Sequence, residues 1–143
     1  MKVEQITIFL ENKPGGLEKV TKILKDAPIN IRTLAVADTS DFGIVRLIVN
    51  NVELATIVLK ESGFTVSRTT VVAVEVPDRP GGLHSILEVL AKENINIAYM
   101  YAFVEKSGEN AVMLFRFDKQ DAAIDVLLKN GITVLPGEKL YSF

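Results

Sequence analysis

The sequence contains no cysteine, no tryptophan and a single histidine, His84. The lack of cysteine excludes disulfide bonds, cysteine-rich zinc sites and thiol nucleophiles. With one histidine, a metal site built from several imidazoles is excluded as well. No apolar stretch approaches the ~18 residues that a membrane-spanning helix needs. The chain therefore has few of the side chains on which enzymes and metalloproteins usually depend.

The chain also lacks an excess of either charge, because 16 Lys and Arg stand against 18 Asp and Glu, for a net charge of −2. Electrostatic attraction to nucleic acid or to anionic lipid is therefore weak, and we expect neither as a partner. Glu4 stands where a secretory signal would need an apolar run, so we expect a cytoplasmic protein. With 48% apolar residues, the 143-residue chain can bury a sizeable core.

The most informative feature that is present is an internal repeat. Residues 11–34 read ENKPGGLEKVTKILKDAPINIRTL, and residues 77–100 read PDRPGGLHSILEVLAKENINIAYM. Pro14 corresponds to Pro80, 66 positions later, and the same offset aligns the two Ile-Asn-Ile motifs. The repeat predicts two units, residues 1–68 and 69–143.

The second copy is slightly longer than the first. Gly63 and Gly131 are 68 positions apart, so two residues have been added after the Ile-Asn-Ile motif. We place them in the turn-forming cluster at residues 106–109, where the chain can lengthen at little cost.

Each copy predicts the order strand, helix, strand, strand, helix, strand. β-Branched runs precede each Pro-Gly-Gly, and apolar residues at helical spacing follow it. Second helices are expected at about 52–62 and 121–130, each with glycine as its C-cap, and short last strands from Phe64 and Ile132. This order is that of the ferredoxin-like βαββαβ arrangement, an antiparallel sheet with both helices on one face.

Two features of the repeat bear on how the units are joined. A unit of ~70 residues is marginally stable alone, and no flexible, Gly/Ser-rich linker lies between Val66 and Val71. We therefore expect an α+β protein in which the two units pack side by side as one body.

The two glycine loops are candidate binding sites, because glycine at the start of a helix lets an anion approach unpaired backbone N–H groups. No nucleotide-binding glycine spacing is present, so a carboxylate is a better candidate than a phosphate. Asn12 and Asp78 can accept hydrogen bonds from an ammonium group, and Asn30 and Asn96 offer both donors and acceptors. These residues are also common turn formers, so a purely structural role for the loops stays open.

The two motifs together resemble an ACT domain, a small-molecule regulatory module, in each half. The first copy has Asn12-Lys13-Pro14-Gly15-Gly16-Leu17 with Ile29-Asn30-Ile31, and the second has Asp78-Arg79-Pro80-Gly81-Gly82-Leu83 with Ile95-Asn96-Ile97. They cover essentially the whole chain, which is similar to a stand-alone tandem ACT protein. The resemblance implies βαββαβ units that pair into an eight-stranded sheet.

The resemblance also implies that amino acids bind between the first loop of one unit and the second strand of its partner. One site would join Asn12, Gly15 and Gly16 to Asn96 and Ile97, and the other would join Asp78, Gly81 and Gly82 to Asn30 and Ile31. Asp78 replaces the asparagine of the first loop, so the two sites need not be equally strong.

The function implied by the resemblance is regulatory and non-catalytic, with a free amino acid as effector, no cofactor and an unidentified regulated protein. Exposed sheet edges favour a homodimer. Tyr99, Tyr101 and Phe103 alternate along one strand face, and we interpret them mainly as core or interface filling. As a pocket wall they would slightly favour an aromatic or imidazole-bearing ligand.

Other candidate residues carry weaker predictions. His84 and Glu88 are four residues apart and could touch one metal ion, but no third ligand is evident, so we interpret them as surface residues. Lys19, Lys22 and Lys25 are interpreted as a solvated helix face. Two alternatives remain: a small acylphosphatase-like hydrolase with Arg32 or Arg79 at an anion-binding loop, and a purely structural assembly module.

Overall fold

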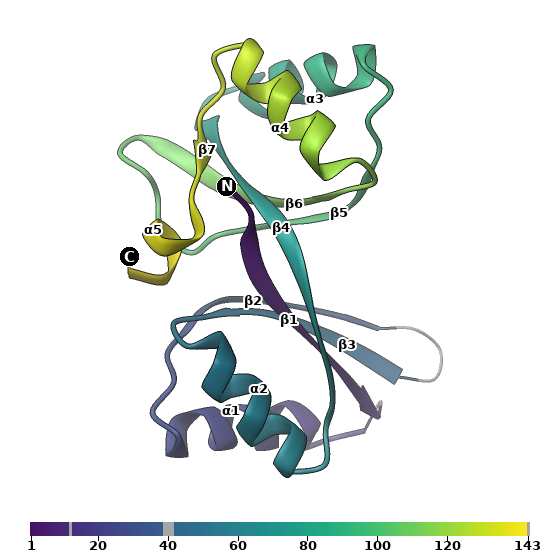
Figure 1. The fold of residues 1–143 in the computed structure, drawn as a ribbon, viewed down its shortest axis with the longest axis vertical. Helices are drawn as coiled ribbons and strands as arrows, with labels where there is room; N and C mark the ends of the chain where they lie inside the picture. Colours follow the sequence, from purple (N-terminus) through teal and green to yellow (C-terminus); the bar gives the residue numbers. More distant parts are fainter. Residues whose placement is uncertain (12, 39–41, 143) are drawn as a thin grey trace. The chain divides into compact units, whose positions relative to one another are not determined.

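The structure, a computed structural model, describes residues 1–11, 13–38 and 42–142. Its contacts divide the chain into two compact units. The N-terminal unit contains Glu4–Thr69 and Ser142, and the C-terminal unit contains Met1–Val3 and Thr70–Tyr141. Both have the α+β, βαββαβ order that the repeat predicts (Figure 1).

The N-terminal unit is a sheet with the strand order β2-β3-β1-β4. Strand β3 is antiparallel to both β1 and β2, and Ile8 lies opposite Val45. Alternate residues of β1 and β3 pack with Val20 and Leu24 of α1 and with Leu59 of α2, so both helices cover one face of this sheet. The elements are β1 (Val3–Glu11), α1 (Gly16–Asp26), β2 (Ile31–Asp38), β3 (Phe42–Val49), α2 (Val52–Glu61) and β4 (Thr65–Pro77).

The C-terminal unit repeats this plan with the order β7-β4-β6-β5. Its core combines valines of β4 with apolar residues of α3 and α4, and with Phe115 and Phe117, whose rings stack 5.2 Å apart. The remaining elements are α3 (Gly82–Lys92), β5 (Ile97–Ala102), β6 (Asn110–Phe117), α4 (Gln120–Lys129), β7 (Val134–Leu135) and α5 (Gly137–Ser142).

Strand β4 differs from the prediction. Two strands were expected, one beginning at Phe64 and one in the valine-rich run before Pro80, but Thr65–Pro77 is a single 13-residue strand. Its sequence, TVSRTTVVAVEVP, has no glycine and no proline before its last residue, and β-branched residues favour extended backbone throughout. The boundary between the units, at Thr69 and Thr70, lies inside this strand.

A glycine follows each second helix as predicted, but it stands one position after the C-cap rather than at it, because each helix ends one residue earlier than expected. Ser62 and Asn130 are the C-caps, and Gly63 and Gly131 follow with φ of 89° and 72°. Glycine adopts this left-handed backbone without the strain that a Cβ would add. The short helix α5 was not predicted, because its six residues show no clear helical period.

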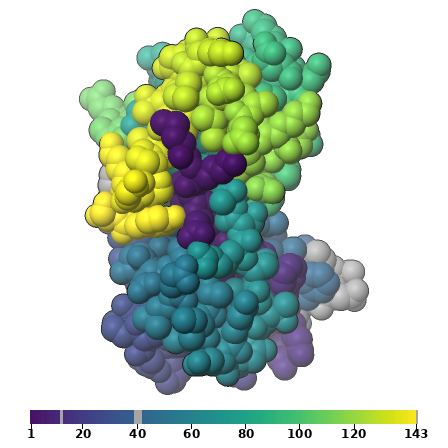
Figure 2. Space-filling view, viewed as in Figure 1, coloured from purple at the N-terminus to yellow at the C-terminus, as the bar shows by residue number. Residues whose placement is uncertain are grey.

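The first residues of the chain belong to the C-terminal unit. They lie beside α4 in the space-filling view (Figure 2), where Lys2 Nζ is 2.9 Å from Asp121 Oδ1. The first three residues therefore pack with the unit that comes later in the sequence. No periodicity in the sequence indicates this.

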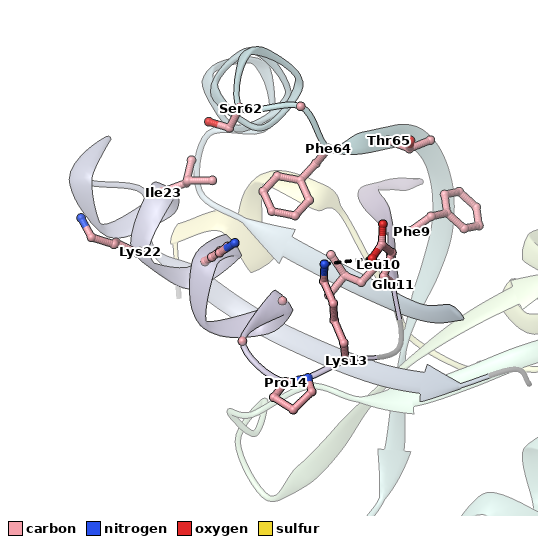
Figure 3. Close-up of a pocket in the computed structure, with 14 residues that line it drawn as sticks. Phe9, Leu10, Glu11, Lys13, Pro14, Lys22, Ile23, Ser62, Phe64 and Thr65 are labelled. Carbon is pink, nitrogen blue, oxygen red and sulfur yellow. Dashed lines mark ion pairs between the residues drawn. The ribbon is translucent and has the colours of Figure 1, made fainter. Parts of the chain in front are cut away.

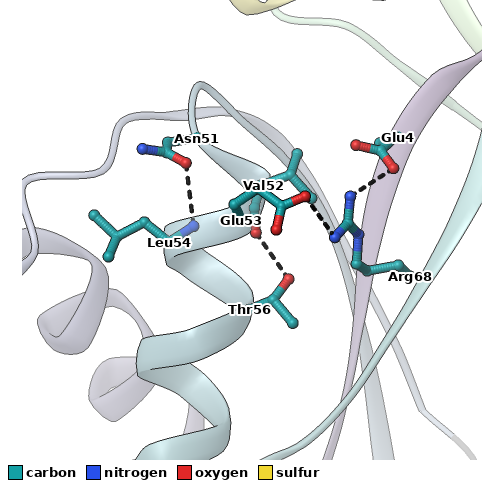
Figure 4. Close-up of polar contacts among 7 residues, drawn as sticks. All are labelled: Glu4, Asn51, Val52, Glu53, Leu54, Thr56 and Arg68. Atoms are coloured by element: carbon teal, nitrogen blue, oxygen red, sulfur yellow. Dashed lines mark hydrogen bonds and ion pairs between the residues drawn. The ribbon is translucent and has the colours of Figure 1, made fainter.

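Arg68 connects three elements of the N-terminal unit (Figure 4). From β4, its Nη2 donates to Glu4 Oε1 of β1 at 2.6 Å, and its Nη1 donates to Glu53 Oε1 of α2 at 3.0 Å. These contacts raise the pKa of Arg68 above its ordinary value, since hydrogen bonds to Glu4 and then Glu53 stabilise the charged guanidinium. The Arg68 side chain is 33% exposed, so solvent screens both pairs.

We expect Arg68→Met to lower the free energy of unfolding by about 1 kcal/mol, because each partly exposed ion pair contributes only modestly. Urea denaturation at low and high salt measures this, and the loss should shrink at high salt. Arg68→Lys is the matched control: it keeps the charge but not the fork that reaches two carboxylates, so it should recover part of the loss. A loss unaffected by salt would contradict the ion-pair explanation.

Candidate functional site

The two Pro-Gly-Gly loops have the same backbone conformation. Gly15 and Gly81 are the N-caps of α1 and α3, with φ of 90° and 83°, and neither helix start has a side-chain cap. Glycine is required there because the backbone is left-handed. The repeated motif therefore builds the same helix entrance twice.

The next glycine distinguishes the two loops. The N–H of Gly82 donates to the carbonyl of Arg79 at 3.0 Å, and Gly82 is buried. The N–H of Gly16 has no acceptor within the part of the chain that the structure describes. Only the first loop thus presents this helix N–H to a ligand.

A pocket of about 500 Å³ opens beside the first loop (Figure 3). It lies between the loop with the start of α1 and the turn from α2 into β4, and all of its lining comes from the N-terminal unit. Phe64 points into it from the turn just before β4, and Leu10 and Ile23 add apolar surface. The complete lining is Phe9, Leu10, Glu11, Lys13, Pro14, Gly15, Gly16, Lys19, Lys22, Ile23, Ser62, Gly63, Phe64 and Thr65.

The charges around the pocket are mainly positive. Lys13 Nζ is 2.9 Å from Glu11 Oε2, and this hydrogen-bonded ion pair lowers the pKa of the Glu11 carboxyl below its ordinary value. Lys22 pairs with Asp26 at 3.1 Å, whereas Lys19 has no such partner among the described residues. Lys19 is therefore the cation that is open to a bound anion.

The lysines of α1 belong to an exposed helix face, as the sequence indicates. Lys19 and Lys22 also line the pocket, which the sequence does not indicate. At the repeat offset, the second copy has Ser85 and Glu88 in their places. This difference between the copies is the sequence signal that could have pointed to the two lysines, because shared ancestry of the repeats does not explain residues found in one copy alone.

The repeated asparagines are held in the same way in both units. The N–H of Asn30 donates to Asn50 Oδ1 at 2.9 Å, and the N–H of Asn50 returns a bond to the Asn30 carbonyl at 3.1 Å. Asn96 makes the equivalent pair with Asp118, at 3.0 and 3.1 Å. With their backbones bonded in this way, only the exposed side-chain amides of the two asparagines are available to a ligand.

The predicted site residues are only partly brought together within each unit. Gly15 and Gly16 lie at the start of α1, whereas Asn30 and Ile31 follow its end, about 16 Å away for a helix of this length. Gly81 and Gly82 are separated from Asn96 and Ile97 by α3 in the same way. Asn12 lies outside the described residues. The pairing of each loop with the asparagine of the other unit stays a prediction.

Asp78, predicted to accept an ammonium group, already has a cationic partner. Lys106, from the lengthened turn of the second copy, forms an ion pair with its carboxylate. Both side chains remain more than half exposed, at 59% for Lys106 and 52% for Asp78.

The remaining candidates are less informative. Tyr99 and Tyr101 lie on the β5 face that points away from the helix-side core, because a bulge between Ile97 and Tyr99 shifts the alternation, and neither lines the pocket. His84 Nε2 and Glu88 Oε2 are 3.9 Å apart on the exposed side of α3. No cluster of three possible metal ligands, and no helix long and apolar enough to span a membrane, occurs in the residues that the structure describes.

Comparison with known proteins identifies the class of this protein. The whole chain, residues 1–143, matches the family described as "ACT domain pair", and the chain therefore belongs to that family. It is also similar to protein BT0572 from Bacteroides thetaiotaomicron, with 37% identity over 100% of this chain and 98% of that one, and a TM-score of 0.93. The ACT resemblance seen in the sequence is confirmed.

More distant solved structures share the fold. The regulatory subunit of aspartate kinase from Thermus thermophilus, in its ligand-free form, has 15% identity over 88% of this chain and 90% of that chain, with a TM-score of 0.61. The equivalent subunit from Thermus flavus has 16% identity over the same shares, with a TM-score of 0.56. A search of curated proteins found no match. Membership of the ACT pair family supports a regulatory role that involves a small ligand.

The two loops differ in a way that mutation can measure. A Cβ at position 82 would overlap the carbonyl oxygen of Pro77, whereas a Cβ at position 16 would meet nothing nearer than Leu10 Cδ1 at 3.5 Å. We expect Gly82→Ala to lower the free energy of unfolding by about 1–3 kcal/mol, the usual cost of overpacking. Gly16→Ala, its matched control, should leave stability unchanged or slightly raised. Denaturant unfolding of both variants measures the difference, and equal losses would show that the two loops are packed alike.

Proposed function

We propose that this protein is a non-catalytic effector sensor that binds a free amino acid, and that the pocket beside the first Pro-Gly-Gly loop receives it. The observation that carries the proposal is the coincidence of that pocket with a helix N–H and a lysine that have no partner among the described residues. Gly16 supplies the N–H, Lys19 supplies the cation, and both line the same cavity. Backbone N–H groups at a helix start together with a cation suit a carboxylate.

The other walls of the pocket fit the rest of an amino acid. Leu10, Ile23 and Phe64 provide apolar surface for a side chain, while the hydroxyls of Ser62 and Thr65 and the Glu11 carboxylate provide acceptors for an ammonium group. A mostly apolar cavity with a few polar groups to fix orientation is the usual form of a small-molecule site. Phe64 and Phe9 are the aromatic residues of this pocket, and in this proposal they contribute to its preference among ligand side chains.

Binding regulates only if it favours one state of the protein over another. A ligand shifts an equilibrium by its difference in affinity for the two states, and a regulated partner must distinguish them. In this proposal the bound amino acid changes the state of the protein, and a partner protein responds to that change. Formation of a homodimer stays a prediction.

A thermal-shift panel of the twenty proteinogenic amino acids tests the proposal. A ligand at 100 times its dissociation constant adds about 2.7 kcal/mol of stability, which raises the melting temperature measurably. We expect at least one amino acid to stabilise the wild type, and Lys19→Met to weaken that stabilisation about tenfold in ligand concentration, the equivalent of losing one charge-assisted hydrogen bond.

Lys25→Met is the matched control, because Lys25 lies on the same helix and does not line the pocket. It should bind as the wild type does. If no amino acid stabilises the protein, the proposed function is wrong. If Lys19→Met and Lys25→Met weaken binding equally, the ligand binds somewhere other than this pocket.

A further inference from the structure

The charged side chains beside the first loop can engage more than the two charges of a neutral amino acid. Lys19, Glu11 and Lys13 all line the pocket, and Glu11 Oε2 forms an ion pair of 2.9 Å with Lys13 Nζ (Figure 3). Lys22 also lines the pocket, but its Nζ pairs with Asp26, which does not. Two positive charges and one negative charge can therefore meet a single bound molecule.

This set of three charges belongs to the first copy of the repeat. At the repeat offset, the three positions become Pro77, Arg79 and Ser85, of which only Arg79 is charged. The two helix starts nevertheless have the same backbone conformation. Building the loop therefore does not require the three charges.

A neutral amino acid matches only part of the set. Its carboxylate would bind the Gly16 N–H and Lys19, and its ammonium group would bind Glu11. Because Glu11 is the ion-pair partner of Lys13, the ammonium group would share that carboxylate and leave Lys13 only partly compensated. The N-terminus of α1 adds partial positive charge nearby, which makes an uncompensated cation still less favourable.

We propose that the ligand is an acidic amino acid, whose side-chain carboxylate binds Lys13 while its ammonium group binds Glu11. Its α-carboxylate binds the Gly16 N–H and Lys19. The inference rests on the proposed function, because it names the class of amino acid that this same pocket receives. Glu11 and Lys13 then each exchange the other for an opposite charge on the ligand. Their side chains are 79% and 63% exposed, so separating them costs little.

Pairs of acid and amide test the proposal, because glutamate and glutamine, or aspartate and asparagine, have the same shape and differ in one charge. Thermal-shift titration of the wild type with each of the four gives apparent dissociation constants. We expect at least one acid to bind about three- to fivefold more tightly than its amide, as suits a solvent-exposed ion pair. Lys13→Met should abolish this preference.

Lys22→Met is the matched control, since it removes a pocket lysine whose Nζ pairs with Asp26, and it should keep the preference. An equal loss of preference in both variants, or a preference that persists in Lys13→Met, would overturn the assignment of Lys13. If some amino acid stabilises the protein but neither acid binds more tightly than its amide, the inference is wrong and the proposed function stands. If none of the twenty amino acids stabilises it, both fail.

Discussion

One continuous strand, β4, contributes to the sheet of each unit. Strand β4 lies beside β1 in the N-terminal unit and pairs with β6 and β7 in the C-terminal unit, and the boundary between the units lies within it. Each half would be marginal if it had to fold alone, as expected for a unit of ~70 residues. Since neither sheet is complete without β4, a break in this strand would remove an edge from one unit and a central strand from the other.

The two units share the same backbone at the starts of α1 and α3, but the polar groups around these two helix starts differ. The first has a cavity lined by Phe64, beside which the Gly16 N–H and Lys19 have no partner in the described part of the chain. The second has its N–H bonded at Gly82 and its carboxylate neutralised by Lys106. The same backbone thus supports two helix starts that differ in the pairing of one glycine N–H and of one loop carboxylate.

The sequence predicted the fold well, because its signals are local and occur twice. Pro-Gly-Gly marks both helix starts, and the apolar periods that follow identify the faces that pack on each sheet. The continuity of β4 was not predicted, since two neighbouring β-branched runs look the same whether or not the backbone bends between them. Nor was the placement of Met1–Val3 with the C-terminal unit, which depends on pairing between residues far apart in sequence.

The candidate site was harder to predict from the sequence, because it also depends on contacts between residues far apart in the chain. Glycines at a helix start can be recognised from the motif, but a cavity depends on what packs across from them. Here that is the turn carrying Ser62 and Phe64, about fifty residues further along the chain. The partner of Asp78 likewise comes from Lys106, in a turn whose extra length was predicted but whose contact with the second loop was not. Contacts between residues this far apart produce no periodic pattern in the sequence from which they could be predicted.

The absence of cysteine, which excludes thiol chemistry, also allows the pocket to be labelled at a single introduced thiol. A cysteine placed at Ser62, an exposed position on the pocket wall, would be the only thiol in the chain. A maleimide dye attached there would label one defined position without removing any native thiol. Entry of a small molecule beside Phe64 could then be followed by fluorescence in the otherwise unmodified protein.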